Sequence, residues 1–143
     1  MRCNIVVIDA NFLFLPIQFK IDFLSEINYI LVGKNYFLIY KQIFDELESK
    51  KKRLHEISKF GRELNFAKKY LESNKNNYNL VYINKIKQIT ETTDRFLLDE
   101  CLRLKKKHPN IFLATNDSQL RREISKANIS NVYLRQKKYL DIC

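Results

Sequence analysis

The chain has 143 residues, of which 45% are hydrophobic, so it is long enough to bury the core of one domain. Its formal charge of +10 favours a polyanionic partner, whereas two glycines exclude both a Gly-x-Gly-x-x-Gly turn and a phosphate-binding loop. Three scattered cysteines exclude a disulfide framework, and no apolar stretch approaches the roughly 20 residues that cross a bilayer, so we expect a cytoplasmic protein with no membrane partner.

In the first half of the chain, apolar runs alternate with helical periodicity. Residues 4–8 predict a strand, residues 22–31 an amphipathic helix, and residues 36–40 a second strand that leads directly into a helix carrying Ile43 and Leu47. Residues 54–71 predict a longer helix. The side chains that it is expected to bury are Leu54, Ile57, Gly61, Leu64 and Leu71.

The second half of the chain repeats this alternation, and Thr92 or Thr93 can cap one of its helices. The predicted elements are a loop at 73–77, a strand at 80–83, a helix at 94–107, a strand at 111–114, a helix over 120–127 and a strand at 132–134. Short connections between strands and helices are typical of a three-layer α/β/α sandwich. We therefore expect a single domain over residues 1–143 with a central, mostly parallel five-stranded sheet.

Two of the predicted strands break off at or near an aspartate. Asp9 follows the apolar run at 5–8, and Asp117 follows the run at 111–114 after a Thr-Asn pair. Ligands of α/β sheets gather where parallel strands end, and two carboxylates in one crevice repel each other unless a cation lies between them. The pattern predicts a metal site.

Two further acids are candidates for the same crevice. Glu46 borders the apolar face of the helix that follows residue 40, and Asp94 begins a helix on the face that Leu97 shares. Asp99 and Glu100 lie off that apolar face and compete with Asp94 for the third position. Each acid also has a structural interpretation, since Asp94 can face the helix dipole, Asp117 can cap a helix and Glu46 can form a surface ion pair.

Six segments together resemble the PIN-domain ribonucleases, and they extend over nearly the whole chain. Two of them resemble an archaeal branch related to the small-subunit processome endonuclease that cleaves precursor ribosomal RNA. The segments are VIDANFL at 7–13, PIQF at 16–19, FDELE at 44–48, TDRFL at 93–97, ATND at 114–117 with LRR at 120–122, and VYLRQKK at 132–138.

The resemblance implies a metal-dependent endoribonuclease. Asp9, Glu46, Asp94 and Asp117 would bind one or two Mg²⁺ or Mn²⁺ ions, which take oxygen ligands and activate water. Asn11, Thr115 and Asn116 are candidates for orienting these carboxylates. The basic side chains that could follow the RNA backbone are Arg121, Arg122, Arg135, Lys137 and Lys138.

The cellular role has two alternatives by resemblance, ribosomal RNA processing or a VapC-type toxin. The resemblance also implies a homodimer and either an antitoxin or a ribosome-assembly partner. Ala10 stands where the family usually has Thr or Ser, and Arg95 where this branch often has a second Asp. These departures support the alternative of a catalytically weak or inactive RNA-binding module, but retention of all four acids argues against it and favours an active nuclease. A phosphoacceptor receiver domain is disfavoured because Asp9 has no acidic neighbour.

Overall fold

Six strands form one sheet in the computed structural model, which describes residues 2–55 and 58–143. The strand order is β3-β2-β1-β4-β5-β6. The strands β1 to β5 run parallel to one another, and β6 at the edge is antiparallel to β5. The strands are β1 (Cys3–Ile8), β2 (Lys34–Tyr40), β3 (Asn79–Ile83), β4 (Ile111–Ala114), β5 (Ser130–Arg135) and β6 (Tyr139–Ile142).

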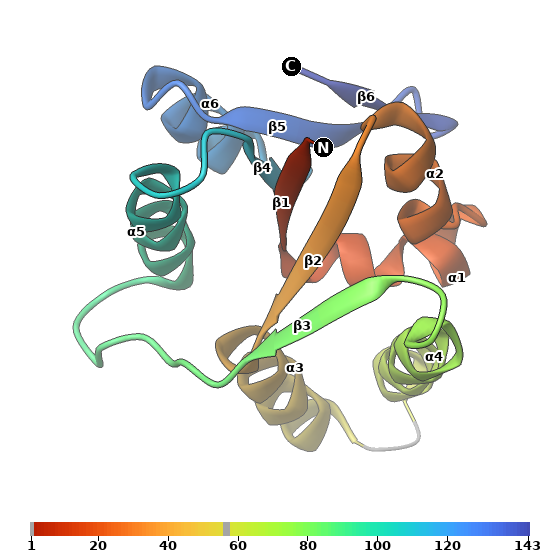
Figure 1. The fold of residues 1–143 in the computed structure, drawn as a ribbon. Coiled ribbons are helices and arrows are strands. Elements are labelled where there is room, and N and C mark those ends of the chain that lie inside the picture. The colour runs from red at the N-terminus through yellow and green to blue at the C-terminus, as the bar shows by residue number, and fades with distance from the viewer. Residues whose placement is uncertain (1, 56–57) are drawn as a thin grey trace.

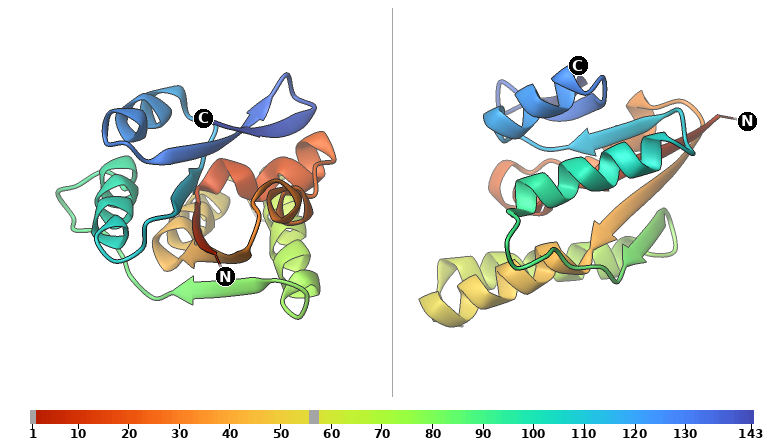
Figure 2. Two further views of the ribbon diagram at one scale, coloured as in Figure 1. Left: turned by 45° about the horizontal axis from the view of Figure 1, so that its top comes forward. Right: turned by 90° about the vertical axis from the view of Figure 1, so that its left-hand side faces the viewer.

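Helices cover both faces of this sheet (Figure 1). On one side α5 packs beside α6, and on the other α4 contacts α1 and α3. Figure 2 shows the same layers from two further directions. The helices are η1 (Ala10–Phe14), α1 (Leu15–Phe19), α2 (Phe23–Ile30), α3 (Lys41–Leu54), α4 (Lys59–Asn74), α5 (Thr93–Lys105) and α6 (Ser118–Lys126). The predicted three-layer α/β/α sandwich is confirmed.

The central strands form the core because their apolar runs are buried on both faces, as parallel strands between two helical layers must be. Val6 and Val7 of β1 are fully buried, and Leu113 and Ala114 of the adjacent β4 are buried as well. Their pairing is in register from Ile5 opposite Ile111 to Ile8 opposite Ala114. The residue after each strand therefore emerges at the same edge of the sheet.

The prediction of five strands is wrong, because β6 adds a sixth at the edge of the sheet. A tight hairpin turn connects β5 to β6, with positive φ at both Gln136 and Lys137. Such turns usually carry Asn-Gly or Asp-Gly, so Gln-Lys leaves no turn signal in the sequence. The short helices η1 and α1 were also not predicted.

The predicted helix at 54–71 is wrong at its start. Leu54 ends α3 and is half exposed, and α4 begins after Ser58, whose side chain accepts a hydrogen bond from the Gly61 amide. This cap is the physical reason for the second helix, since a serine at this position satisfies an amide that the helix leaves unpaired. The predicted buried residue Ile57 lies outside the described residues, whereas Gly61, Leu64 and Leu71 are buried as predicted.

Within the described ranges, no helix combines the length and the apolar character that crossing a bilayer requires.

A buried carboxylate connects α5 to β2 and to the loop after β3. Glu100 accepts hydrogen bonds from the Tyr40 hydroxyl at 3.0 Å, from Lys85 Nζ at 2.5 Å and from Arg103 Nη2 at 2.9 Å. The sequence placed Glu100 off the apolar face, but its residue is only 4% exposed. Burial alone would raise the pKa of Glu100, yet the hydrogen bonds from Arg103, Lys85 and Tyr40 outweigh burial and lower it. Glu100 therefore has a structural role, in which it stabilises the fold.

Replacing Glu100 with glutamine should lower the free energy of unfolding by about 2 kcal/mol at neutral pH, because two cations and a hydroxyl lose a charged acceptor. A carboxyl whose pKa is lowered by folding stabilises the protein at neutral pH and loses that contribution in acid. The variant should therefore lose less stability than the parent between neutral pH and about pH 3. Urea denaturation at both pH values measures this difference. The matched control is Asp99→Asn, which breaks the surface pair with Arg95 and should cost less than about 1 kcal/mol.

Candidate active site

The candidate site lies where β1 and β4 end, at the point where the chain order of the sheet reverses. β1 continues outward to β2 and β3 on one side and adjoins β4 and β5 on the other. Open α/β sheets bind their ligands at such a point. Asp9 directly follows β1, and its amide donates to the Ala114 carbonyl of β4 at 3.0 Å. The two strand ends are thereby joined.

Asp9 is the most buried of the four acids that the resemblance assigns to the metal, at 7% exposure. One carboxylate oxygen accepts the Ala10 amide at 2.7 Å, and the other accepts the Thr115 hydroxyl at 2.7 Å and the Asn11 amide group at 3.2 Å. Burial raises the pKa of Asp9, and the negative charge of Asp117 raises it further, against the opposing effect of these hydrogen bonds. A buried carboxylate with a raised pKa in a crevice is typical of a functional site.

The three residues predicted to orient the carboxylates all take part in one network. The Thr115 hydroxyl, which is fully buried, donates to Asp9 and accepts the Asp117 amide at 3.1 Å. Asn11 accepts the Asn116 amide at 3.1 Å through its side-chain oxygen. Asn116 in turn accepts the Leu134 amide of β5 at 2.7 Å. The network holds the ends of β1, β4 and β5 in a fixed relation.

Asp117 is the N-cap of α6, as its structural interpretation predicts. Its Oδ1 accepts the Leu120 amide at 2.7 Å. The same carboxylate still acts on the other acids, since its charge raises the pKa of both Asp9 and Asp94. The capping role and a position in the acidic cluster are therefore compatible.

Asp94 lies in the first turn of α5, and the charged groups that shift its pKa are all negative. Burial raises its pKa, and so do the charges of Asp117, Asp9, Glu123 and Glu46, in that order. Each of these charged groups is an acid. The charges of Asp9, Asp117 and Glu46 thus all act on Asp94, and a cation bound there would offset this repulsion.

Glu123 is an acid that the sequence prediction missed. It lies on α6, which packs against α5, and it lines a cavity of about 530 Å³ together with Asp94 and Gln119. No pattern in the sequence around Glu123 indicates this position, because only the contact between α5 and α6 brings Glu123 to Asp94. We call this cavity the Asp94 pocket; its lining residues are Thr92, Asp94, Arg95, Leu98, Gln119, Glu123 and Lys126.

Glu46 is held on α3 by two side chains that the sequence prediction also missed. Gln42, one turn earlier on the helix, donates to Glu46 Oε1 at 3.2 Å, and the Thr93 hydroxyl donates to the same oxygen. Gln42 is itself oriented, because its side-chain oxygen accepts the Lys87 amide at 3.0 Å. A glutamine four residues before a glutamate on one helix face is the local signal that could have found this pair.

The competing acids are engaged elsewhere. Asp99 forms a surface ion pair with Arg95 at 3.1 Å, and Glu100 belongs to the buried network with Tyr40. Because Arg95 pairs with Asp99, part of its positive charge is offset there instead of acting on Asp94. Both observations favour Asp94 as the third acid.

No three His, Cys, Asp or Glu side chains among the described residues stand close enough together to enclose a metal ion. The donor chemistry nevertheless fits Mg²⁺ or Mn²⁺, because the charged neighbours that shift the pKa of Asp94 are all carboxylates. Mg²⁺ keeps several waters and needs only one or two protein carboxylates, so a closed cage is not required.

The predicted RNA-binding residues lie in two places. Arg121 and Arg122 are on α6, one turn after Asp117, while Arg135 ends β5 and Lys137 and Lys138 lie in the turn that follows. Arg135 forms an ion pair with Asp141 of β6 at 2.9 Å. Arg121 and Arg122 are thus closer in sequence to Asp117 than the other three basic residues are.

Comparison with known proteins shows the family of this chain. The chain matches the family described as "PIN like domain" over residues 6–137. It is 32% identical over 137 residues to "Ribonuclease VapC4" of Methanocaldococcus jannaschii, covering 96% of this chain and 95% of that protein.

Solved structures show the same fold. "Structure of the PIN domain endonuclease Utp24" matches with a TM-score of 0.69 and 20% identity, over 96% of this chain and 90% of that one. A domain of a functionally unknown protein from Methanocaldococcus jannaschii matches with a TM-score of 0.63 and 16% identity, over 92% and 91% of the two chains. The family match and the 32% identity over nearly the whole chain show that the chain belongs to the PIN-like domain family.

Proposed function

We propose that this protein is a metal-dependent endoribonuclease that hydrolyses RNA phosphodiester bonds. The observation that carries the proposal is the environment of Asp94, whose pKa is raised by burial and then by four acids. Carboxylates that raise one another's pKa oppose folding, and a cation bound among them removes that cost. The relative named Ribonuclease VapC4 supports RNA as the substrate.

Asp9, Asp94, Asp117 and Glu46 would hold one or two Mg²⁺ or Mn²⁺ ions. When bound, the ion lowers the pKa of a water molecule and stabilises negative charge on phosphate oxygens. Glu123 is a further carboxylate within the electrostatic reach of Asp94. The donors are all oxygens, which matches the preference of these hard cations.

The chain's own residues orient Asp9 and Glu46. The Thr115 hydroxyl and the Asn11 amide donate to Asp9, which opposes the rise in its pKa that burial causes. Gln42 and Thr93 both bind one oxygen of Glu46, so its second oxygen is left to face a ligand. Asp9 and Glu46 are thus held in place by polar neighbours before substrate arrives.

The decisive experiment is RNA cleavage with controlled metal. A fluorescent, structured RNA should be cut at internal positions in the presence of Mn²⁺ or Mg²⁺, and EDTA should abolish cleavage because the acids then repel one another and the substrate phosphate. Readdition of Mn²⁺ should restore it. Gel analysis of the products distinguishes internal cuts from trimming of the ends.

Cleavage that persists in EDTA would contradict the metal-dependent mechanism. If metal-loaded protein binds RNA but cuts none of a varied set, the alternative of a non-catalytic RNA-binding module is favoured. The two predicted cellular roles differ in substrate, so precursor ribosomal RNA and the cell's other RNAs should be compared in the same assay. A toxin should also arrest growth when expressed alone.

A further inference from the structure

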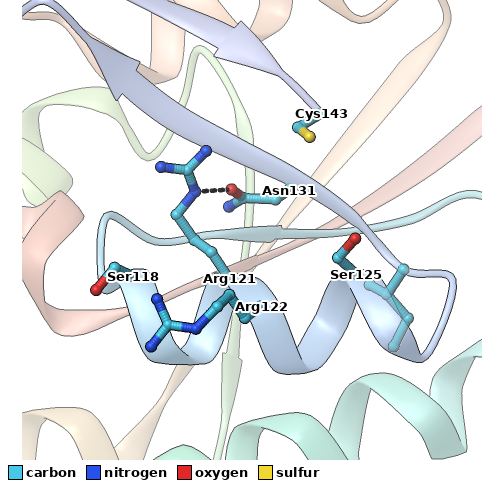
Figure 3. A pocket seen from close by; sticks show the side chains of 7 residues that line it. Ser118, Arg121, Arg122, Ser125, Asn131 and Cys143 are labelled. Atoms are coloured by element: carbon cyan, nitrogen blue, oxygen red, sulfur yellow. Dashed lines mark hydrogen bonds between the residues drawn. The ribbon is translucent and has the colours of Figure 1, made fainter.

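A second cavity lies on another side of α6 from the Asp94 pocket. Its volume is about 340 Å³, and its polar lining consists of Ser118, Arg121, Arg122, Ser125, Asn131 and Cys143. Figure 3 shows that α6 supplies the two arginines and two serines, while Asn131 from β5 points toward Arg121. Among the described residues, no aspartate or glutamate side chain lines this cavity, in contrast to the Asp94 pocket. We call it the Arg121 pocket.

The guanidinium group of Arg121 is held in one orientation. Its Nε donates to Asn131 Oδ1 at 2.6 Å, and its plane lies over the Tyr133 ring at 3.8 Å from the ring centre. Asn131 is only 4% exposed, and its amide nitrogen donates to the Leu113, Thr115 and Val132 carbonyls. Its oxygen is therefore left to face Arg121, so a buried asparagine sets the direction of a surface cation.

The positive charge of Arg121 has no acidic partner within residues 2–55 and 58–143. The ion pairs there use Lys41, Lys68, Lys75, Lys85, Arg95, Arg103 and Arg135. Of the five N–H groups that a guanidinium carries, Asn131 uses the one on Nε. The terminal groups form a planar fork that matches two oxygens of a phosphate.

We propose that the Arg121 pocket binds a backbone phosphate of the RNA strand, adjacent to the phosphate that is cleaved. This inference rests on the proposed endoribonuclease function. Ser118, which lines the pocket, directly follows Asp117, and the Arg121 amide donates to the Asp117 carbonyl at 2.9 Å. A strand that reaches the acids at the start of α6 therefore passes one helical turn from the oriented guanidinium.

The test uses binding that is independent of cleavage. The Asp9→Asn variant in EDTA is titrated with a fluorescent oligouridine, and Arg121→Met is added in that background. We expect the dissociation constant to rise about tenfold, the scale of losing one charge-assisted contact. The slope of its logarithm against the logarithm of salt concentration should fall by about 0.7, the value for one phosphate of a single strand.

Two further variants make this result specific. Arg121→Lys keeps the charge but loses the fork and the stacking on Tyr133, so it should recover only part of the affinity. Lys69→Met removes an exposed charge from α4 and should leave the affinity within about twofold. The melting temperature of each variant is measured, and RNA affinities are compared only among variants whose melting temperature matches that of the parent.

Cleavage kinetics separate failure of the pocket from failure of the proposed function. With Asp9 intact and Mn²⁺ present, Arg121→Met should raise KM while kcat stays within about threefold, because it removes binding common to substrate and transition state. If the parent cuts RNA but Arg121→Met changes neither affinity, salt slope nor KM, the pocket proposal is overturned. Weakened binding by Arg121→Met in a protein that cuts nothing would support the pocket and contradict the nuclease.

Inorganic phosphate is the other source of the same chemistry. If it binds the parent, Arg121→Met should weaken that binding together with RNA binding. Loss of phosphate binding with unchanged RNA affinity would overturn the assignment to the RNA backbone.

Discussion

Replacing Asp9 with asparagine should lower the rate of RNA cleavage by about 10³-fold, the scale of removing one electrostatic group from a catalytic site. The substitution keeps the shape of the side chain and removes a carboxylate from a residue that is only 7% exposed. Asparagine keeps one acceptor oxygen, and relief of the repulsion from Asp117 offsets the loss of the other oxygen, so the melting temperature should change little. Single-turnover cleavage and thermal unfolding measure the two effects.

An activity loss combined with nearly unchanged stability is the signature of a functional acid. The matched control is Asp45→Asn on α3, whose carboxylate forms a surface ion pair with Lys41 at 2.6 Å and should leave cleavage within about twofold. A variant Asp9→Asn that retains a tenth or more of the parent rate would contradict the assignment of Asp9.

Replacing Thr115 with valine should lower both stability and cleavage. The variant has nearly the same shape, but Asp9 loses its buried hydroxyl donor and the Asp117 amide loses its acceptor. We expect the free energy of unfolding to fall by about 1–3 kcal/mol, the cost of leaving buried polar groups unpaired. Cleavage should fall by about 10–100-fold, as is usual when a residue that orients a metal ligand is lost.

Rescue by serine distinguishes the hydroxyl from the bulk of the side chain. Thr115→Ser restores the donor to Asp9 and should recover most of the cleavage activity at a small cost in stability. Thr90→Val, at an exposed loop position, is the control for the substitution itself and should change neither quantity measurably. If Thr115→Val and Thr115→Ser cleave at the same rate, the hydroxyl has no part in the site.

The sheet was largely predictable because β1, β2 and β4 are continuous apolar runs, the pattern of strands buried on both faces. Asp9 and Asp117 were predictable for the same reason, since each closely follows such a run. β6 could not be predicted, because a turn centred on Gln136 and Lys137 lacks the residues that usually mark a hairpin.

The parts of the site that escaped prediction depend on contacts between separate elements. Glu123 reaches Asp94 only because α6 packs beside α5, and Thr93 reaches Glu46 only because α5 begins next to α3. Glu100 shows the converse error. Its helical position placed it off the apolar face as a competitor for the third site position, whereas Lys85 from the preceding loop and Tyr40 from β2 cover it. Spacing within one helix contains no information about partners on another.

The bond between Thr115 and Asp9 joins residues 106 positions apart in the chain. Their strands pair only after β4 has been synthesised, although β1 leaves the ribosome before the other strands of this sheet. A nascent chain that ends before β4 therefore has Asp9 without Thr115, Asp117 or the carbonyl of Ala114. Contacts of such long range also form late and slowly during folding. Translation order thus delays assembly of the acidic cluster until most of the domain exists, and the growing polypeptide emerges beside ribosomal RNA before its own carboxylates have converged.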